Sequence, residues 1–134
     1  MDASNWIAER SETKHLRAGY FGSSTGGGAA LVAASEIGDE IGAVGSRSGR
    51  PDMAGEALTR VVSPTLLIVG GLDRVVIRLN EEAYRKLRCK KELKIVPGAT
   101  HLFEEPGKLE EVARLAAEWF RHYLHPQSAI DQPK

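Results

Sequence analysis

The chain has 134 residues, of which 42% are hydrophobic and 27% are charged, values typical of one soluble globular domain. Lysine and arginine together number 18, as do aspartate and glutamate, so no excess of charge favours binding to nucleic acid or to an anionic membrane surface. The single cysteine, Cys89, excludes an internal disulfide and a cysteine-rich metal site.

Segments that direct a chain to a membrane are not expected. The first 15 residues lack the apolar core and the small-residue cleavage site of a signal peptide. The apolar stretches are about five residues long, whereas a helix that spans a bilayer needs about 20. We therefore expect a cytoplasmic protein without a membrane partner.

Predicted strands and helices alternate along the chain after a short helix expected in residues 1–15. Such alternation indicates a three-layer α/β sandwich with a mostly parallel sheet. We assign residues 1–125 to this domain and residues 126–134 to a polar tail. Strands are predicted at residues 16–21, 41–46, 65–69 and 93–96, and helices at 26–36, 54–60, 80–89 and from 106 onward.

The third of these helices has a predicted start at Asn80. An asparagine side chain caps the exposed N–H groups of a first turn, and Glu81 and Glu82 behind it would favour the positive end of the helix dipole.

A glycine-rich turn stands between the first predicted strand and the next helix. Residues 22–26 read Gly-Ser-Ser-Thr-Gly and fit the pattern G-x-S-x-G, for which roughly 0.1 chance matches are expected in such a chain. In this context the pattern is typical of a nucleophilic serine. The turn projects the Ser24 hydroxyl above the strand, and the N–H of Thr25 points at the oxyanion that forms during the reaction.

Other interpretations of the turn stay open. It could merely bring helix and strand close together. A P-loop is excluded because no lysine follows the glycines, and the dinucleotide spacing G-x-G-x-x-G is absent. A nucleotide-binding βαβ unit with Arg47 near a 2′-phosphate is therefore a weak alternative.

A nucleophilic serine needs a base, and His101 is the histidine that closely follows a predicted strand. Asp73, which follows the strand at 65–69, is a candidate to orient that histidine. Taken alone, His101 could also be a surface loop histidine, and Asp73 is more typical of a solvated turn. Together with Ser24 they follow three parallel strands, whose carboxyl ends meet at one edge of the sheet. The chain order serine, aspartate, histidine is that of the hydrolases.

These segments resemble the C-terminal half of an α/β-hydrolase, and among these the dienelactone hydrolase group. The matching stretches are YFGSSTGGGAAL, PTLLIVGGLD and IVPGATHLFEEPG. The resemblance implies Ser24 as nucleophile, His101 as base and Asp73 as the orienting acid, although dienelactone hydrolase itself carries cysteine as the nucleophile. The short gaps between the three residues leave no room for a lid domain.

The same resemblance implies a larger fold of about eight strands. The four strands predicted here correspond to the fifth through eighth, and the loop that supplies the family's second oxyanion donor has no counterpart. The strand at 16–21 would then be an open edge, and open edges pair with other chains. We therefore expect a homodimer or a partner chain that supplies the missing strands. The alternative is a truncated, weakly active or inactive module.

Further residues could contact a substrate. Arg47 and Arg50 lie just past the second strand, at the site edge, and could bind a carboxylate or phosphate, although a solvated loop pair is the commoner case. Phe103 could line a pocket beside His101 or belong to the core. No metal or cofactor is expected, because the histidines are scattered.

The sequence thus predicts a serine hydrolase that cleaves small carboxylic esters or lactones through an acyl-enzyme. Its rate should rise with pH as an ordinary imidazole, with a pKa of about 6.5, loses its proton.

Overall fold

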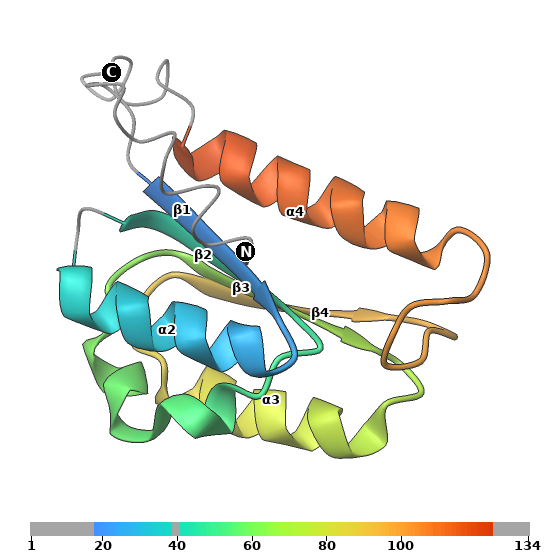
Figure 1. The fold of residues 1–134 in the computed structure, drawn as a ribbon, viewed down its shortest axis with the longest axis horizontal. Helices are drawn as coiled ribbons and strands as arrows, with labels where there is room; N and C mark the ends of the chain where they lie inside the picture. The colour runs from blue at the N-terminus through green and yellow to red at the C-terminus, as the bar shows by residue number, and fades with distance from the viewer. Residues whose placement is uncertain (1–17, 39–40, 125–134) are drawn as a thin grey trace.

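The computed structural model describes residues 18–38 and 41–124, so the helix predicted at residues 1–15 and the polar tail at 126–134 lie outside the described residues. Strands and helices alternate throughout this range (Figure 1). In chain order they are β1 (Ala18–Ser23), α2 (Thr25–Ile37), β2 (Ile41–Arg47), η3 (Pro51–Arg60), β3 (Thr65–Gly70), α3 (Arg74–Lys86), β4 (Lys91–Val96) and α4 (Lys108–Leu124).

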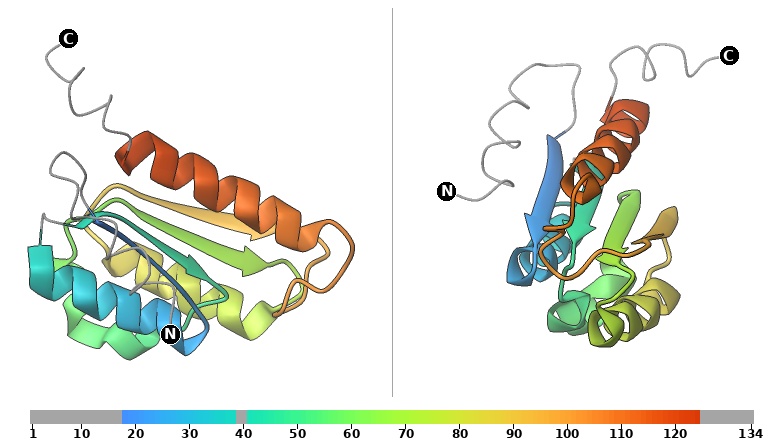
Figure 2. Two further views of the ribbon diagram at one scale, coloured as in Figure 1. Left: turned by 45° about the horizontal axis from the view of Figure 1, so that its top comes forward. Right: turned by 90° about the vertical axis from the view of Figure 1, so that its right-hand side faces the viewer.

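The four strands form one parallel sheet in the order β1-β2-β3-β4. Figure 2 shows α4 on one face of the sheet and α2, η3 and α3 on the other, which confirms the predicted three-layer α/β architecture. The register aligns the carboxyl ends of the strands, because Ser23 lies beside Arg47 and Gly70 beside Val96. The connections that follow the strands therefore start at one common edge.

The sheet is buried on both faces at its centre. All six residues of β3 are buried, as expected for the apolar run predicted to be a central strand. One core cluster lies between the sheet and the α2 side, with Leu31, Val44 and Leu67 among its members. The other lies under α4 and includes Ile68 and Phe103. Burying a side chain of this size stabilises the fold by about 1.5–3 kcal/mol.

The start of α3 differs from the prediction. The helix begins at Arg74 and ends at Lys86, so the predicted N-cap role of Asn80 is wrong. Asn80 lies inside the helix and is fully buried, and its Nδ2 donates hydrogen bonds to the carbonyls of Val76 at 2.8 Å and Gly49 at 3.2 Å. A long-range bond to another segment therefore decides the position of this asparagine, and the local capping rule does not.

Smaller differences concern where elements begin. β4 starts at Lys91, two residues before the prediction, because Lys91 pairs with Thr65 of β3. The segment η3 starts at Pro51 and is kinked at Gly55, whose φ is 53°. No helix in residues 18–38 or 41–124 combines the length and apolarity needed to cross a bilayer.

Within the described residues, β1 pairs with β2 along one side only. It thus forms one edge of the four-stranded sheet, in the place that the sequence analysis expected for an open edge. The strand is short, and Phe21 near its end packs edge-on against Phe120 of α4 with ring centroids 6.2 Å apart.

Candidate active site

Ser24 occupies a sharp turn between β1 and α2. Its φ is 52° and its ψ is −123°, a conformation that a residue with a side chain rarely adopts. Main-chain hydrogen bonds hold the turn in place: the Ser24 N–H donates to the Arg47 carbonyl at 3.1 Å, and the Ser24 carbonyl accepts from the Arg50 N–H at 3.1 Å. The end of β2 therefore fixes the position of the serine.

Close approach of the backbone explains one of the motif glycines. A Cβ on Gly22 would meet the Gly26 carbonyl, so only glycine fits where β1 folds back into α2. Gly26 itself has open space around its Cα. The second constrained glycine is Gly27, where a Cβ would meet the hydroxyl of Ser46. Gly28 is also crowded, because a Cβ there would meet the Arg50 carbonyl, so the crowded positions are Gly22, Gly27 and Gly28.

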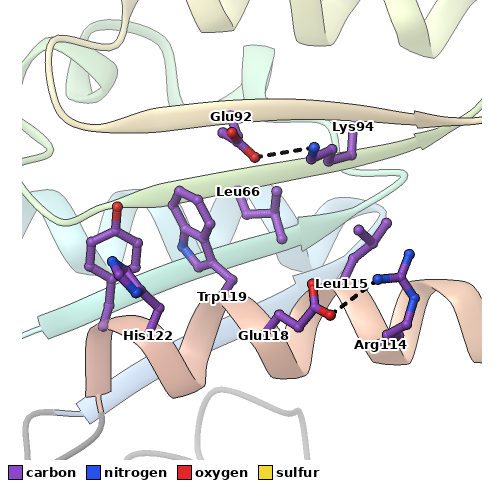
Figure 3. A pocket seen from close by; sticks show the side chains of 9 residues that line it. Leu66, Glu92, Lys94, Arg114, Leu115, Glu118, Trp119 and His122 are labelled. Carbon is purple, nitrogen blue, oxygen red and sulfur yellow. Dashed lines mark hydrogen bonds and ion pairs between the residues drawn. The ribbon is translucent and has the colours of Figure 1, made fainter. Parts of the chain in front are cut away.

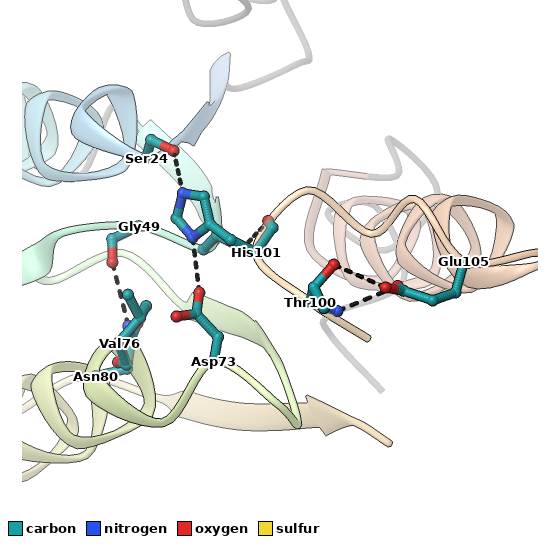
Figure 4. A network of polar contacts seen from close by, with 9 residues as sticks. Ser24, Gly49, Asp73, Val76, Asn80, Thr100, His101 and Glu105 are labelled. Atoms are coloured by element: carbon teal, nitrogen blue, oxygen red, sulfur yellow. Dashed lines mark hydrogen bonds and ion pairs between the residues drawn. The ribbon is translucent and has the colours of Figure 1, made fainter. Parts of the chain in front are cut away.

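The structure brings Ser24, His101 and Asp73 together, as Figure 4 shows. The Oγ of Ser24 lies 3.0 Å from Nε2 of His101. On the other side of the ring, Nδ1 of His101 lies 2.6 Å from Oδ2 of Asp73. The three residues come from the ends of β1 and β3 and from the loop after β4, so their contacts depend on the shared edge of the sheet.

The partners of the imidazole fix its tautomer. A carboxylate only accepts hydrogen bonds, so Nδ1 of His101 carries a proton and donates it to Asp73. Nε2 is then free to accept the hydroxyl proton of Ser24. The Asp73 side chain is 15% exposed and that of His101 is 39% exposed, so the carboxylate is shielded while the imidazole still faces solvent. This arrangement can move a proton from the serine to the histidine.

Thr25 is the first residue of α2. The first N–H groups of a helix have no acceptor within the helix, and the helix dipole adds positive charge there. The N–H of Thr25 is therefore available at the position that the sequence analysis assigned to an oxyanion donor.

The two predicted substrate contacts lie against each other. The guanidinium of Arg47 sits over the ring of Phe103, 5.9 Å from its centroid. Phe103 is 1% exposed and belongs to the core cluster under α4, which favours the core interpretation over a pocket wall. Arg50 instead pairs with Asp52 at 3.0 Å, and this pairing lowers the pKa of the aspartate.

Sequence reasoning missed two contacts of the His101 loop. The hydroxyl of Ser48, at the end of β2, donates to the His101 carbonyl at 2.8 Å. Glu105 accepts hydrogen bonds from the N–H and the hydroxyl of Thr100, at 3.1 and 2.8 Å, and the hydroxyl bond foremost lowers the pKa of Glu105. A Thr-x-x-x-x-Glu loop is a weak local signal of the second contact, but no local pattern indicates the first.

A separate hollow of about 350 Å³ lies between β3, β4 and α4 (Figure 3). Its charged residues already pair with one another, Glu92 with Lys94 and Arg114 with Glu118. None of Ser24, Asp73 and His101 lines it. The candidate site is therefore identified by the contacts among these three side chains and not by the volume of a cavity. Among residues 18–38 and 41–124, no three histidine, cysteine, aspartate or glutamate side chains come together to hold a metal ion.

A parallel sheet in which a strand turns into a helix at a serine, with a histidine and an aspartate beyond the neighbouring strands, is the arrangement of the α/β-hydrolase fold. Residues 1–124 match the model of the dienelactone hydrolase family, and the chain belongs to that family.

Solved structures agree with this assignment. The chain is similar to a dienelactone hydrolase from Anabaena variabilis, with a TM-score of 0.84 and 58% sequence identity over 92% of this chain and 57% of that one. A monoacylglycerol lipase from Paleococcus ferrophilus shares the fold with a TM-score of 0.73 at 20% identity, covering 90% of this chain and 74% of that one.

Curated relatives carry a different kind of name. In two strains of Mycobacterium tuberculosis, proteins named "Putative phosphoribosyl transferase" are 56% identical to the chain over 124 residues. The match covers 92% of this chain but 28% of each relative. The chain thus spans little more than a quarter of these proteins and just over half of the Anabaena dienelactone hydrolase.

Proposed function

We propose that this chain supplies the nucleophile, base and orienting acid of a serine hydrolase that cleaves small carboxylic esters or lactones. The observation that carries the proposal is the pair of contacts on one imidazole, Ser24 Oγ to Nε2 at 3.0 Å and Asp73 Oδ2 to Nδ1 at 2.6 Å. Membership of the dienelactone hydrolase family supports the reaction class.

In the first half-reaction, Oγ of Ser24 attacks the carbonyl carbon of the ester while its proton passes to Nε2 of His101. The carboxylate of Asp73 stabilises the resulting imidazolium through its bond to Nδ1. The carbonyl electron pair moves onto oxygen, where the N–H of Thr25 donates to the oxyanion. As the tetrahedral intermediate collapses, the C–O bond to the alcohol breaks, and Nε2 returns its proton to the leaving oxygen.

In the second half-reaction, water takes the place of the alcohol. His101 removes a proton from the water as it attacks the acyl carbon, and the proton then returns to Oγ of Ser24 as the acid product leaves. With a lactone the leaving alcohol stays tethered to the acyl group, so the product is a single hydroxy acid.

Arg47 is the candidate for recognising an anionic group on the substrate. Its carbonyl is bonded to the Ser24 N–H, so its backbone adjoins the nucleophile, and the residue as a whole is half-buried. Guanidinium groups bind carboxylates and phosphates in a two-pronged geometry. A substrate that carries such a group would have to compete with the ring of Phe103 for this side chain.

Active-site labelling tests the proposal. A fluorophosphonate probe should form one covalent adduct, located on Ser24 by mass spectrometry, and Ser24→Ala should abolish it. Ser23→Ala is the matched control, since Ser23 is the adjacent, exposed serine and should leave labelling unchanged. Turnover of p-nitrophenyl acetate should follow the same pattern. Labelling at Ser23, or none at all, would contradict the proposed nucleophile.

An alternative is a hydrolase-like module that is weakly active or inactive without a partner chain. The side of β1 that pairs with no other strand of residues 18–38 and 41–124 motivates it, together with the 57% coverage of the Anabaena enzyme. We propose that β1 pairs with a second copy of this chain, or with a partner that supplies further strands. Labelling of Ser24 without turnover would favour the module, and saturable NADPH binding without labelling would favour a nucleotide-binding unit.

The transferase name of the mycobacterial relatives does not decide the activity of this chain. The matched stretch is 28% of those proteins, and it is the stretch that matches the dienelactone hydrolase family.

A further inference from the structure

Three turns around His101 adopt an unusual backbone conformation. Among the described residues, Ser24, Ser48 and Phe103 are the non-glycine residues with positive φ, at 52°, 50° and 57°. Each such residue costs about 1–3 kcal/mol relative to ordinary backbone, so the surrounding structure must hold it. All three lie close to His101: Ser24 bonds to its ring, Ser48 bonds to its main-chain carbonyl, and Phe103 lies two residues further along the loop.

Ser48 stands out among them because its buried hydroxyl takes no part in the proposed reaction steps. Elsewhere the chain uses glycine for positive φ, as at Gly55 and Gly98. Glycine would relieve the same strain at position 48, but it would remove the hydroxyl. The Ser48 hydroxyl must therefore make a contact whose benefit outweighs the cost of the strained backbone.

The hydroxyl ties the end of β2 to the histidine loop. Its Oγ donates to the His101 carbonyl at 2.8 Å, while the Ser48 N–H donates to the Ile68 carbonyl of β3 at 2.7 Å. Ser48 is 1% exposed, so water cannot easily replace the hydroxyl. Other bonds reach the loop beside the histidine, such as the one from Leu72 N–H to the Ala99 carbonyl, but the Ser48 bond reaches His101 itself.

The imidazole depends on such anchors. Its side chain is 39% exposed, and its orientation is set by one contact on each ring nitrogen. A shift of about 1 Å in a reacting group can cost about 100-fold in rate. We propose that Ser48 is a positioning residue: its hydroxyl holds the main chain of His101 so that Nε2 reaches Ser24 while Nδ1 reaches Asp73. This inference rests on the proposed hydrolase function.

Two substitutions separate positioning from stability. Ser48→Ala removes the hydroxyl and keeps the strained backbone, whereas Ser48→Gly removes the hydroxyl and relieves the strain. We expect both variants to react with the fluorophosphonate probe about 10- to 100-fold more slowly than the wild type. Ser48→Gly should nevertheless resist urea better than Ser48→Ala. If Ser48 acted on stability alone, the labelling rates would follow the free energies of unfolding, and Ser48→Gly would react faster than Ser48→Ala.

Thr100→Ala is the control variant. It removes a hydroxyl bond from the same loop, the exposed one to Glu105, and should keep a labelling rate within about twofold of the wild type because exposed bonds contribute little. A labelling rate in Ser48→Gly equal to that of the wild type would overturn the inference.

A second readout does not depend on activity. The proton between Nδ1 of His101 and Asp73 should give a far-downfield NMR signal, assigned by its loss in His101→Gln. Ser24→Ala should keep the signal, while Ser48→Gly should shift or broaden it. If the wild type is not labelled and Ser48→Gly still loses the signal, the hydrolase proposal fails and the positioning role stands. An unchanged signal in Ser48→Gly overturns the positioning role alone.

Discussion

The carboxylate of Asp73 occupies the N-cap position of α3, yet it makes no hydrogen bond to that helix and instead accepts one from Nδ1 of His101 at 2.6 Å. Aspartate is among the best N-cap residues, because its oxygen can satisfy a free N–H of the first turn. Here the side chain leaves those N–H groups without that bond, and its contact with the histidine takes precedence over local helix stability.

This relationship predicts that activity and stability separate at position 73. Asp73→Asn should lower the rate of p-nitrophenyl acetate hydrolysis by about 10⁴-fold, because an amide does not hold the imidazole in the required tautomer. The free energy of unfolding should change by about 1 kcal/mol or less, because the Asp73 side chain makes no capping bond to α3 that the substitution would remove. Urea titration measures the second effect. Unimpaired hydrolysis by the variant would rule out the orienting role of Asp73.

The two motif glycines should respond differently to the same change. Gly22→Ala places a Cβ against the Gly26 carbonyl, so we expect a loss of stability of about 1–3 kcal/mol together with loss of probe labelling. Gly26→Ala fills open space inside a helix and should be neutral or stabilise by up to about 1 kcal/mol. Thermal melts and labelling of the two variants side by side check this contrast, and equal effects would contradict it.

Asn80 should be important for stability although it lies away from the reacting groups. Its Nδ2 bonds to the Gly49 carbonyl beside Ser48, and its Oδ1 is buried without a hydrogen-bond partner. Asn80→Ala leaves the Gly49 carbonyl without this donor, which should lower the free energy of unfolding by about 1–3 kcal/mol. Arg78→Ala, on the exposed face of the same helix, should change it by about 0.5 kcal/mol or less. Urea titrations of both variants compare the two values.

Cys89 gives a prediction that depends on pH. Burial raises the pKa of its thiol, against a weaker opposing effect of the bond to the Thr65 hydroxyl. Iodoacetamide at pH 8 should therefore modify the folded protein more slowly than the protein in urea, because the thiolate is the reacting form.

The sign of the stability change follows from the same shift. The unfolded thiol has a pKa of about 8.5 and loses its proton first, so the contribution of Cys89 is complete below that pH and declines as the pH rises further. Cys89→Ala should remove this part of the pH dependence in urea titrations between pH 7 and 10. An identical decline in the variant would show that Cys89 is not its source.

Pairing of the β1 edge predicts that the chain associates. Light scattering at micromolar concentration should give the mass of a dimer, because an edge strand presents a row of free N–H and C=O groups. A monodisperse monomer of the unaltered chain would contradict the proposed pairing.

Local patterns were enough to predict the sheet. The run at 65–69 is apolar on both faces, so its central place in the sheet followed directly, whereas β4 mixes charged and apolar residues and its first two residues were missed. Ser24, Asp73 and His101 lie next to one another in the structure, because parallel strands bring their carboxyl ends to one edge whatever lies between them. Their catalytic roles stay predictions until labelling tests them.

The start of α3 shows where local patterns fail. Asn80 followed by two glutamates has the composition of a helix start, but its amide is used for a bond to Gly49, which lies 31 residues earlier in the chain. The true first position follows Asp73, whose side chain is turned toward His101. The Ser48 contact was missed for the same reason, because its acceptor lies 53 residues away. Contacts between distant segments leave no periodic signal in the sequence.

The site residues lie on the connections and not in the strands, which has a practical consequence for engineering. The buried strands provide the rigid frame, while Ser24, Asp73 and His101 all stand on connections at one edge. A mutagenesis library restricted to the exposed positions of residues 71–75 and 97–106 would vary the surroundings of the reacting atoms without repacking the interior. Such libraries would test which surroundings of Ser24 favour new acyl or alcohol groups, provided that the few residues anchoring the histidine loop are kept constant.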